Sequence, residues 1–161
     1  PLQLANAYAI ISNGGYNIKP TLIKQEINQK RGEQIITQEN SNKINEILRK
    51  IVTSEQGTAN LANIAGYEIA GKTGTAQKSI KGKYSKKKIN TFASIFPISS
   101  PKYVLIVLLD EPKLSETYIY EYNDGKKRKI IGTPFNTAGW TSVEVTKNII
   151  EKIGPILAIK Y

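Results

Sequence analysis

The sequence contains neither cysteine nor histidine among its 161 residues. Disulfide bonds, metal sites built on these two ligands, and catalysis by a thiolate or an imidazole are therefore excluded. Proton transfer in any active site must then use Lys, Tyr, Asp or Glu. Long hydrophobic runs are also missing: the longest, Tyr103 to Leu109, is far too short to span a bilayer. No signal peptide is visible.

Negative charge is scarce as well, because 13 acidic residues face 23 basic ones and give a formal net charge of +10. This balance favours anionic partners such as nucleic acid, acidic lipid headgroups or an anionic polymer. A general enrichment in Lys, Asn and Ile explains the same charge without any partner, so both interpretations stay open. Nucleic acid is the least favoured partner, since no nucleic-acid-binding motif occurs.

A length of 161 residues with 40% hydrophobic content fits one compact domain with a core. Three segments carry apolar residues at the spacing of one helix face. Asn13 to Gly15 ends the first helix, Ser41 is the expected N-cap of the second, and Thr141 with Glu144 forms a T-x-x-E capping box for the third. The apolar residues are Leu4, Tyr8 and Ile11 in the first helix; Ile44, Ile47, Leu48, Ile51 and Val52 in the second; and Val145, Ile149, Ile153 and Leu157 in the third.

Runs of β-branched and aromatic residues predict the strands. Thr91 to Phe96 and Tyr103 to Asp110 form a hairpin around a turn bounded by prolines, and Thr21 to Ile27 pairs with Glu33 to Thr37. The stretch from Leu114 to Thr141 is a long polar connection, whose length suggests function or mobility.

One short predicted strand, Glu68 to Gln77, concentrates groups that suit chemistry. Lys72 supplies a cationic head, and Thr73 and Thr75 supply hydroxyls. Glycines close to the lysine leave the backbone bare, so another chain could lie against it. Together these groups suit the capture of an extended peptide that ends in a carboxylate.

Two alternatives compete for this stretch. Gly66 to Thr73 formally matches the phosphate-binding pattern G-x-x-x-x-G-K-[ST], which requires a buried strand before it and a helix that opens at the lysine. The flanking residues predict neither. A surface hairpin without chemistry is the other alternative.

Lys72-Thr73-Gly74 is also the K-T-G element of the penicillin-recognising serine enzymes. The longer stretch Ala70 to Gln77 resembles the form found in class B penicillin-binding proteins, and the resemblance extends along most of the chain. It includes the P-x-Q-L-A-x-A-Y-A helix that ends in N-G-G, Gln56 to Ala59 before the strand, Phe92 to Pro97 with Ser94 in place of the family's glycine, Asp110 to Lys113, and a tail from Thr137 that is similar to that of a cell-division transpeptidase.

The resemblance implies a mixed α/β (α+β) fold of the penicillin-binding-protein and β-lactamase-like type, with an antiparallel sheet and the first and last helices packed on one face. Residues 1–161 would be the C-terminal part of a transpeptidase domain, a single and incomplete domain. The implied function is that of a peptidoglycan D,D-transpeptidase, which cross-links stem peptides through a serine acyl-enzyme, is a target of β-lactams, and uses no cofactor or metal. A non-catalytic β-lactam sensor, a D,D-carboxypeptidase and a β-lactamase remain as alternatives.

The resemblance also assigns roles within the strand. Lys72 would be catalytic, bonding the serine of the family's S-x-N element and holding positive potential at the reaction centre. The hydroxyls of Thr73 and Thr75 would bind the terminal carboxylate of a D-Ala-D-Ala stem peptide or of penicillin. The backbone N–H of Thr75 would form half of the oxyanion hole, and Gly74 would let the donor peptide run along the strand.

The serine nucleophile is not recognisable in the sequence. Ser85 to Lys88 and Ser99 to Lys102 match S-x-x-K formally, but the first lies in a polycationic loop and the second in a turn. An activated serine needs its lysine one turn along a buried helix, so neither qualifies, and no S-x-N occurs. We therefore expect the nucleophile upstream of Pro1, in a longer parent protein, and expect residues 1–161 to be inactive alone.

The resemblance implies that the parent works at the periplasmic face of the inner membrane, held by an N-terminal anchor. Its partners would be divisome proteins, among them a lipid-linked glycosyltransferase. The lysine-rich stretch Lys78 to Asn90 would be either a solvated surface hairpin, which we favour, or an electrostatic patch that faces anionic peptidoglycan or lipid headgroups. Its lysines are Lys78, Lys81, Lys83, Lys86, Lys87 and Lys88.

Overall fold

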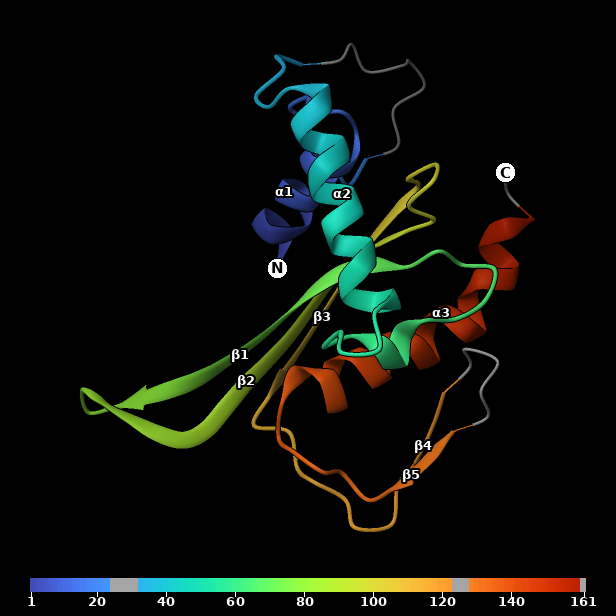
Figure 1. Cartoon of the computed structure of the whole chain (residues 1–161). Helices are drawn as coiled ribbons and strands as arrows, with labels where there is room; N and C mark the ends of the chain where they lie inside the picture. The colour runs from blue at the N-terminus through green and yellow to red at the C-terminus, as the bar shows by residue number, and fades with distance from the viewer. Residues whose placement is uncertain (24–31, 123–127, 160–161) are drawn as a thin grey trace.

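A computed structural model describes residues 1–23, 32–122 and 128–159 (Figure 1). Its α-helices and β-strands confirm the expected mixed α/β class with an antiparallel sheet. The helices are α1 (Leu2–Ser12), α2 (Gln38–Thr53) and α3 (Ser142–Ala158), with short 3₁₀ turns η1 (Asn60–Ala62) and η2 (Ala138–Trp140). The strands are β1 (Ala70–Ile80), β2 (Lys83–Phe96), β3 (Tyr103–Asp110), β4 (Ile119–Glu121) and β5 (Lys129–Ile131).

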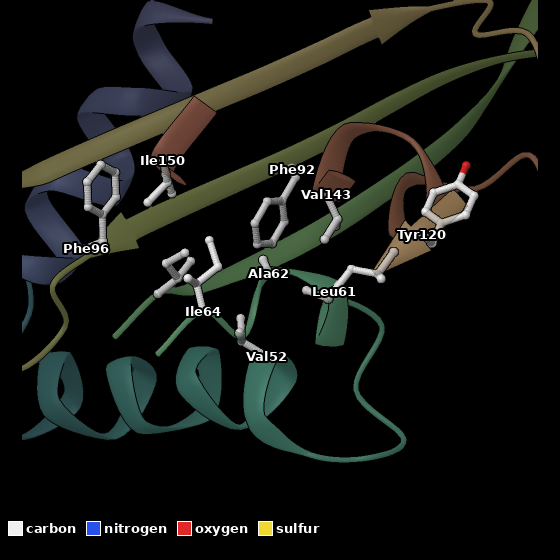
Figure 2. Close-up of a cluster of buried hydrophobic side chains, with 11 residues drawn as sticks. Val52, Leu61, Ala62, Ile64, Phe92, Phe96, Tyr120, Val143 and Ile150 are labelled. Atoms are coloured by element: carbon white, nitrogen blue, oxygen red, sulfur yellow. The ribbon is translucent and has the colours of Figure 1, made fainter. Parts of the chain in front are cut away.

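The main sheet has the order β1-β2-β3, with antiparallel pairing throughout. Side chains alternate between the two faces of a strand, so Phe92 and Ile95 of the central strand point in opposite directions. Both are fully buried, because each face of the sheet has its own cover. Phe92 packs with Val143 and Ile150 of α3 (Figure 2), whereas Ile95 packs in a separate cluster beside Tyr8 and Ile11 of α1.

The expectation that the first and last helices share one face is therefore wrong: α1 and α3 cover opposite faces. The helix α2 lies across the β1 side and contributes to both clusters, with Leu48 in one and Val52 in the other. Burial of the central strand on both faces explains its unbroken apolar run, which a one-sided sheet would not need.

The N-cap predicted for α2 is wrong, whereas Thr141 is the N-cap residue of α3 as predicted but lacks the side-chain bond of a capping box. The true cap of α2 is Thr37, whose hydroxyl accepts the N–H of Asn40 at 3.2 Å, while Ser41 lies buried and donates to the carbonyl of Ile11. At α3, Thr141 precedes the helix but makes no cap bond with its side chain. Its hydroxyl donates instead to the carbonyl of Thr137 at 2.9 Å.

The surface hairpin expected for the lysine-rich stretch is confirmed, but the strand that carries the K-T-G residues continues past its predicted end at Gln77. β1 and β2 run through this stretch and meet at a two-residue turn, Lys81-Gly82, where both residues have positive φ (48° and 76°). Two such residues match the right-handed twist of a hairpin, so the strands continue instead of ending. The connection from Leu114 to Thr141 likewise contains a small hairpin of β4 and β5.

The predicted pairing of Thr21 to Ile27 with Glu33 to Thr37 is not observed among the described residues. Residues 24–31, which include most of its first strand, lie outside the described residues. Residues 33–37 form no strand but pair with the segment after α1, through an isolated bridge between Tyr16 and Gln34. The end of α1 is confirmed, because Gly15 N–H closes it on the carbonyl of Ile10 at 3.0 Å. Within the described ranges, no helix has the length and apolarity needed to cross a membrane.

Candidate active site

The strand that carries the K-T-G residues, β1, lies at the edge of the main sheet. In the described part of the chain, β1 pairs only with β2. The start of β1 is covered by α2, since Arg49 donates from Nη1 to the carbonyl of Ile69 at 2.5 Å and Leu48 packs on Ala70. From Lys72 onward the strand is largely exposed, so a free edge follows a covered start.

This position excludes the phosphate-loop alternative. Lys72 sits within an extended strand, whereas a phosphate-binding loop needs the lysine at the opening of a helix. The residues before it, from Asn63 to Ile69, contain a turn and no strand.

Thr73 and Thr75 are two residues apart on β1 and therefore point to the same face. Both line a pocket with a volume of about 320 Å³. Its other walls come from the segment after α2, from the residue after β4, and from the turn before α3. The lining residues are Gly57, Thr58, Leu61, Thr73, Thr75, Tyr122, Thr137, Gly139 and Trp140.

The Thr73 hydroxyl is held by a second hydroxyl, that of Thr58, at 2.8 Å. Thr58 is in turn fixed by close backbone packing, because a Cβ on Gly139 would lie 2.5 Å from the Thr58 carbonyl oxygen. The sequence reasoning recognised the segment Gln56 to Ala59 but missed this role for Thr58. The only signal was the G-T-A pattern ahead of the strand.

The Thr75 hydroxyl accepts the backbone N–H of Ala138 at 3.0 Å. The turn that supplies this donor is fixed by the fully buried Asn90 of β2, whose Nδ2 donates to Asn136 Oδ1 at 2.9 Å and to Thr141 Oγ1 at 2.8 Å. Asn90 faces Thr75 in the register of the two strands. One amide side chain therefore links β2, the partner of the K-T-G strand, to the far wall of the pocket, which no sequence pattern had indicated.

Lys72 lies on the opposite face of β1 from the two threonines and does not line their pocket. Its side chain is exposed, and Nζ donates to the carbonyl of Thr73 at 2.6 Å. The structure thus brings Thr73 and Thr75 together and leaves Lys72 beside them on the other face, with its ammonium group exposed.

The two nearby glycines are constrained differently. A Cβ on Gly71 would lie 2.4 Å from the Ala93 carbonyl oxygen and 2.8 Å from the Phe92 ring, so this position has no room for a side chain. A Cβ on Gly74 would meet nothing closer than 4.0 Å. Packing within the described residues therefore explains Gly71 but not Gly74, and Gly74 leaves space above the strand.

Both formal S-x-x-K serines lie away from any helix, which confirms their rejection. Ser85 is in β2 and donates to the carbonyl of Lys78 at 2.9 Å. Ser99 is in the turn after β2 and donates to the carboxylate of Glu68. That hydroxyl, followed by the backbone N–H of Ser99, lowers the pKa of Glu68.

Ion pairs brace the sheet beyond the pocket. Lys78 bonds Glu111 at 2.7 Å and Asp110 at 2.9 Å, and Lys87 bonds Glu111 at 3.0 Å. Glu111 first, and then Asp110, raise the pKa of Lys78, while Lys78 and then Lys87 lower the pKa of Glu111. Among residues 1–23, 32–122 and 128–159, no cluster of acidic side chains is placed to hold a metal ion.

A second charged pair lies under the β4 hairpin. Glu144 and Lys147 of α3 are both buried and lie 3.7 Å apart, and Tyr118 donates its hydroxyl to Glu144 at 2.9 Å. Burial raises the pKa of Glu144. Lys147 Nζ donates to the carbonyl of Glu121, which ties the hairpin to α3 beside Tyr122 of the pocket.

Comparison with known proteins shows which family the chain resembles. The family model of the penicillin binding protein transpeptidase domain matches residues 1–136. The chain is 29% identical over 170 residues to "Probable peptidoglycan D,D-transpeptidase FtsI" of Caulobacter vibrioides, covering 99% of the chain and 26% of that protein. It is 33% identical over 138 residues to "Peptidoglycan D,D-transpeptidase FtsI homolog" of Mesostigma viride, covering 71% and 23%.

The fold has matching relatives among solved structures. The apo transpeptidase domain of penicillin-binding protein 3 from Burkholderia pseudomallei superposes with a TM-score of 0.66 at 26% identity, covering 94% of the chain and 41% of that structure. The chain spans about a quarter of the length of these two curated relatives.

Proposed function

The chain belongs to the penicillin-binding protein transpeptidase family, and on that premise we propose that the protein is a peptidoglycan D,D-transpeptidase of the cell-division type. It cross-links cell-wall stem peptides through a serine acyl-enzyme and is acylated by β-lactams. The observation that carries this proposal is the exposed edge of β1, where Thr73 and Thr75 turn their hydroxyls into one pocket.

The pocket suits a carboxylate, which is the end group of a D-Ala-D-Ala peptide and is also present in penicillin. The Thr75 hydroxyl accepts the Ala138 N–H, so its own proton is free to donate to a ligand. The Thr73 hydroxyl shares its hydrogen bond with Thr58, and it can donate to a ligand when Thr58 is the donor of that bond. Hydrogen bonds to an ionised acceptor are shorter and stronger than neutral ones. The two threonines therefore bind the terminal carboxylate and set the position of the scissile carbonyl.

Lys72 and Gly74 act along the same edge. Lys72 is the catalytic cation, and its ammonium group bonds a serine hydroxyl from the S-x-N element and stabilises negative charge at the reaction centre. Gly74 lets the donor peptide lie against the strand as an added β-strand, for which the structure leaves space. The backbone N–H of Thr75 supplies one donor of the oxyanion hole.

The serine nucleophile belongs to a segment of the parent protein outside residues 1–161, because neither Ser85 nor Ser99 lies on a helix with a lysine one turn away. The chain is then the C-terminal part of an incomplete domain and is inactive alone. We place the parent at the periplasmic face of the inner membrane through an N-terminal anchor, with divisome proteins and a lipid-linked glycosyltransferase as partners and no cofactor.

Intact mass spectrometry after incubation with benzylpenicillin tests this function. The full-length protein should gain one adduct per molecule, whereas residues 1–161 alone should gain none. Lys72→Ala in the full-length protein should abolish acylation. No adduct on the full-length protein would contradict the proposed function, and an unchanged rate in Lys72→Ala would remove Lys72 from the mechanism.

A further inference from the structure

The outer parts of β1 and β2 form a ribbon that leaves the body of the molecule. We define the basic arm as residues 76–89, which run from Ala76 out to the Lys81-Gly82 turn and back to Ile89. Figure 1 shows this hairpin projecting away from all three helices. The arm contains six lysines and no acidic residue.

The arm lysines fall into two groups with different surroundings. Those near the base are engaged: Lys78 and Lys87 pair with the carboxylates at the end of β3, and Lys88 Nζ donates to the carbonyl of Asn136 at 2.9 Å. The other three, Lys81, Lys83 and Lys86, are exposed, and no carboxylate of the described residues pairs with them. The positive charge of the arm is therefore neutralised at its base and open at its tip.

The geometry of β1 places this charge on the path of the substrate. The start of β1 is buried and its preceding carbonyl, that of Ile69, is bonded by Arg49 of α2, whereas the strand is largely exposed from Lys72 onward. We therefore expect a peptide whose carboxylate sits at Thr73 and Thr75 to follow the exposed edge toward the arm. At about 3.3 Å per residue, Ile80 lies roughly 17 Å beyond Thr75, which is about the length of five extended residues.

The tip also carries an aromatic side chain. Tyr84 is 80% exposed and stands among the unpaired lysines. A tyrosine ring offers an apolar face together with a polar hydroxyl, which suits a polymer of sugars and peptides better than a purely ionic contact would. Exposed lysines elsewhere on the chain are not part of this combination of positive charge and an aromatic ring.

We propose that the basic arm is a docking surface for the anionic, peptide-bearing glycan polymer that carries the substrate, an inference that rests on the proposed transpeptidase function. Lys81, Lys83 and Lys86 attract carboxylates of the polymer outside the pocket, and β1 leads the donor peptide from the arm to Thr73 and Thr75. The arm thus contributes to polymer capture and not to the chemistry of acylation.

Binding of the full-length protein to purified peptidoglycan, measured by co-sedimentation at about 0.1 M salt, tests the arm. The substitutions Lys81→Gln, Lys83→Gln and Lys86→Gln together should weaken binding about tenfold, since each exposed ionic contact contributes modestly. Reversing the same three charges to Glu should weaken it further. The matched control changes three exposed lysines on other faces to Gln: Lys19, Lys50 and Lys152.

The expected result is a loss confined to the arm variants and diminished by added salt, with benzylpenicillin acylation unchanged in all variants. Equal losses in the arm and control variants would overturn the inference. Binding to vesicles of phosphatidylglycerol and phosphatidylcholine that depends on the arm lysines, without such dependence on peptidoglycan, would overturn it in favour of a membrane surface. Absence of acylation in the unmodified protein would instead overturn the proposed function, and the binding comparison would still be readable.

Discussion

The two halves of β1 are built on different principles. The inner half, from Ala70 to Thr75, is fixed by tertiary contacts on both faces and by hydroxyl partners from distant segments. The outer half is held by its hairpin partner and by ion pairs at its base. A strand that must position a reacting group needs the first kind of support, and a strand that only attracts a flexible polymer can use the second.

The contrast is sharpest at the two glycines of the inner half, where we expect the largest effect. Gly71→Ala should lower the free energy of unfolding by about 3 kcal/mol, because the new Cβ would overlap the Ala93 carbonyl and the Phe92 ring. Gly74→Ala is the matched control and should change stability by less than about 1 kcal/mol, since its Cβ would meet only Thr91, at 4.0 Å. Urea unfolding of the full-length protein measures both.

The rate of acylation, unlike stability, should be affected by the substitution at Gly74. Gly74→Ala should fold normally but slow acylation by benzylpenicillin, because its methyl group would occupy the space proposed for the substrate backbone. Similar stability losses in Gly71→Ala and Gly74→Ala would show that the two positions are not under different constraints.

An intermediate effect is expected at Thr58, which lines the pocket and shares a hydrogen bond with the Thr73 hydroxyl. Thr58→Val removes the hydroxyl at nearly constant volume and should slow acylation about fivefold, the equivalent of about 1 kcal/mol for a lost neutral hydrogen bond. Thr58→Ser keeps the hydroxyl and should restore most of the rate. A Val variant as fast as the unmodified protein would show that Thr73 does not depend on Thr58.

The smallest effect concerns the stability that the ion pairs at the base of the arm contribute, and this contribution depends on pH. The lowered pKa of Glu111 means that its ion pairs stabilise the folded state above the carboxyl's unfolded pKa of about 4.3. This contribution is lost as the pH falls through the folded-state pKa. Glu111→Gln should therefore give a flatter dependence of stability on pH in the acid range, with Glu46→Gln, on α2, as a charge-matched control. Identical acid profiles for the unmodified protein and Glu111→Gln would contradict this assignment.

The inner half of β1 could be predicted from the sequence because its signals are local. Lysine, hydroxyls and glycines lie within a few residues of one another, and the family pattern extends to both sides. The partners of these residues could not be predicted, since Thr58 and Asn90 reach Thr73 and the pocket wall only through the packing of separate segments. The missing cap bonds of Ser41 and Thr141 have a related cause, because each hydroxyl bonds a distant segment: Ser41 donates to the Ile11 carbonyl, and Thr141 accepts from Asn90.

The basic arm was predicted as a solvated hairpin because six lysines indicate solvent exposure, but the lysines weaken the strand pattern, so the strands were expected to end before it. A positive-φ turn at Lys81-Gly82 lets both strands continue through the arm. The placement of α1 and α3 on opposite faces was missed for a related reason. An apolar run such as Thr91 to Phe96 does not tell whether one face or both are covered.

The central claim is that Thr73 and Thr75 hold a carboxylate in their shared pocket. The most direct measurement compares the acylation rates of the full-length protein with benzylpenicillin and with its methyl ester, in which the carboxylate is blocked. The unmodified protein should prefer the free acid, and Thr75→Val should reduce this preference about tenfold, in line with the loss of a hydrogen bond to a charged group. The same preference in the unmodified protein and in Thr75→Val would contradict the claim.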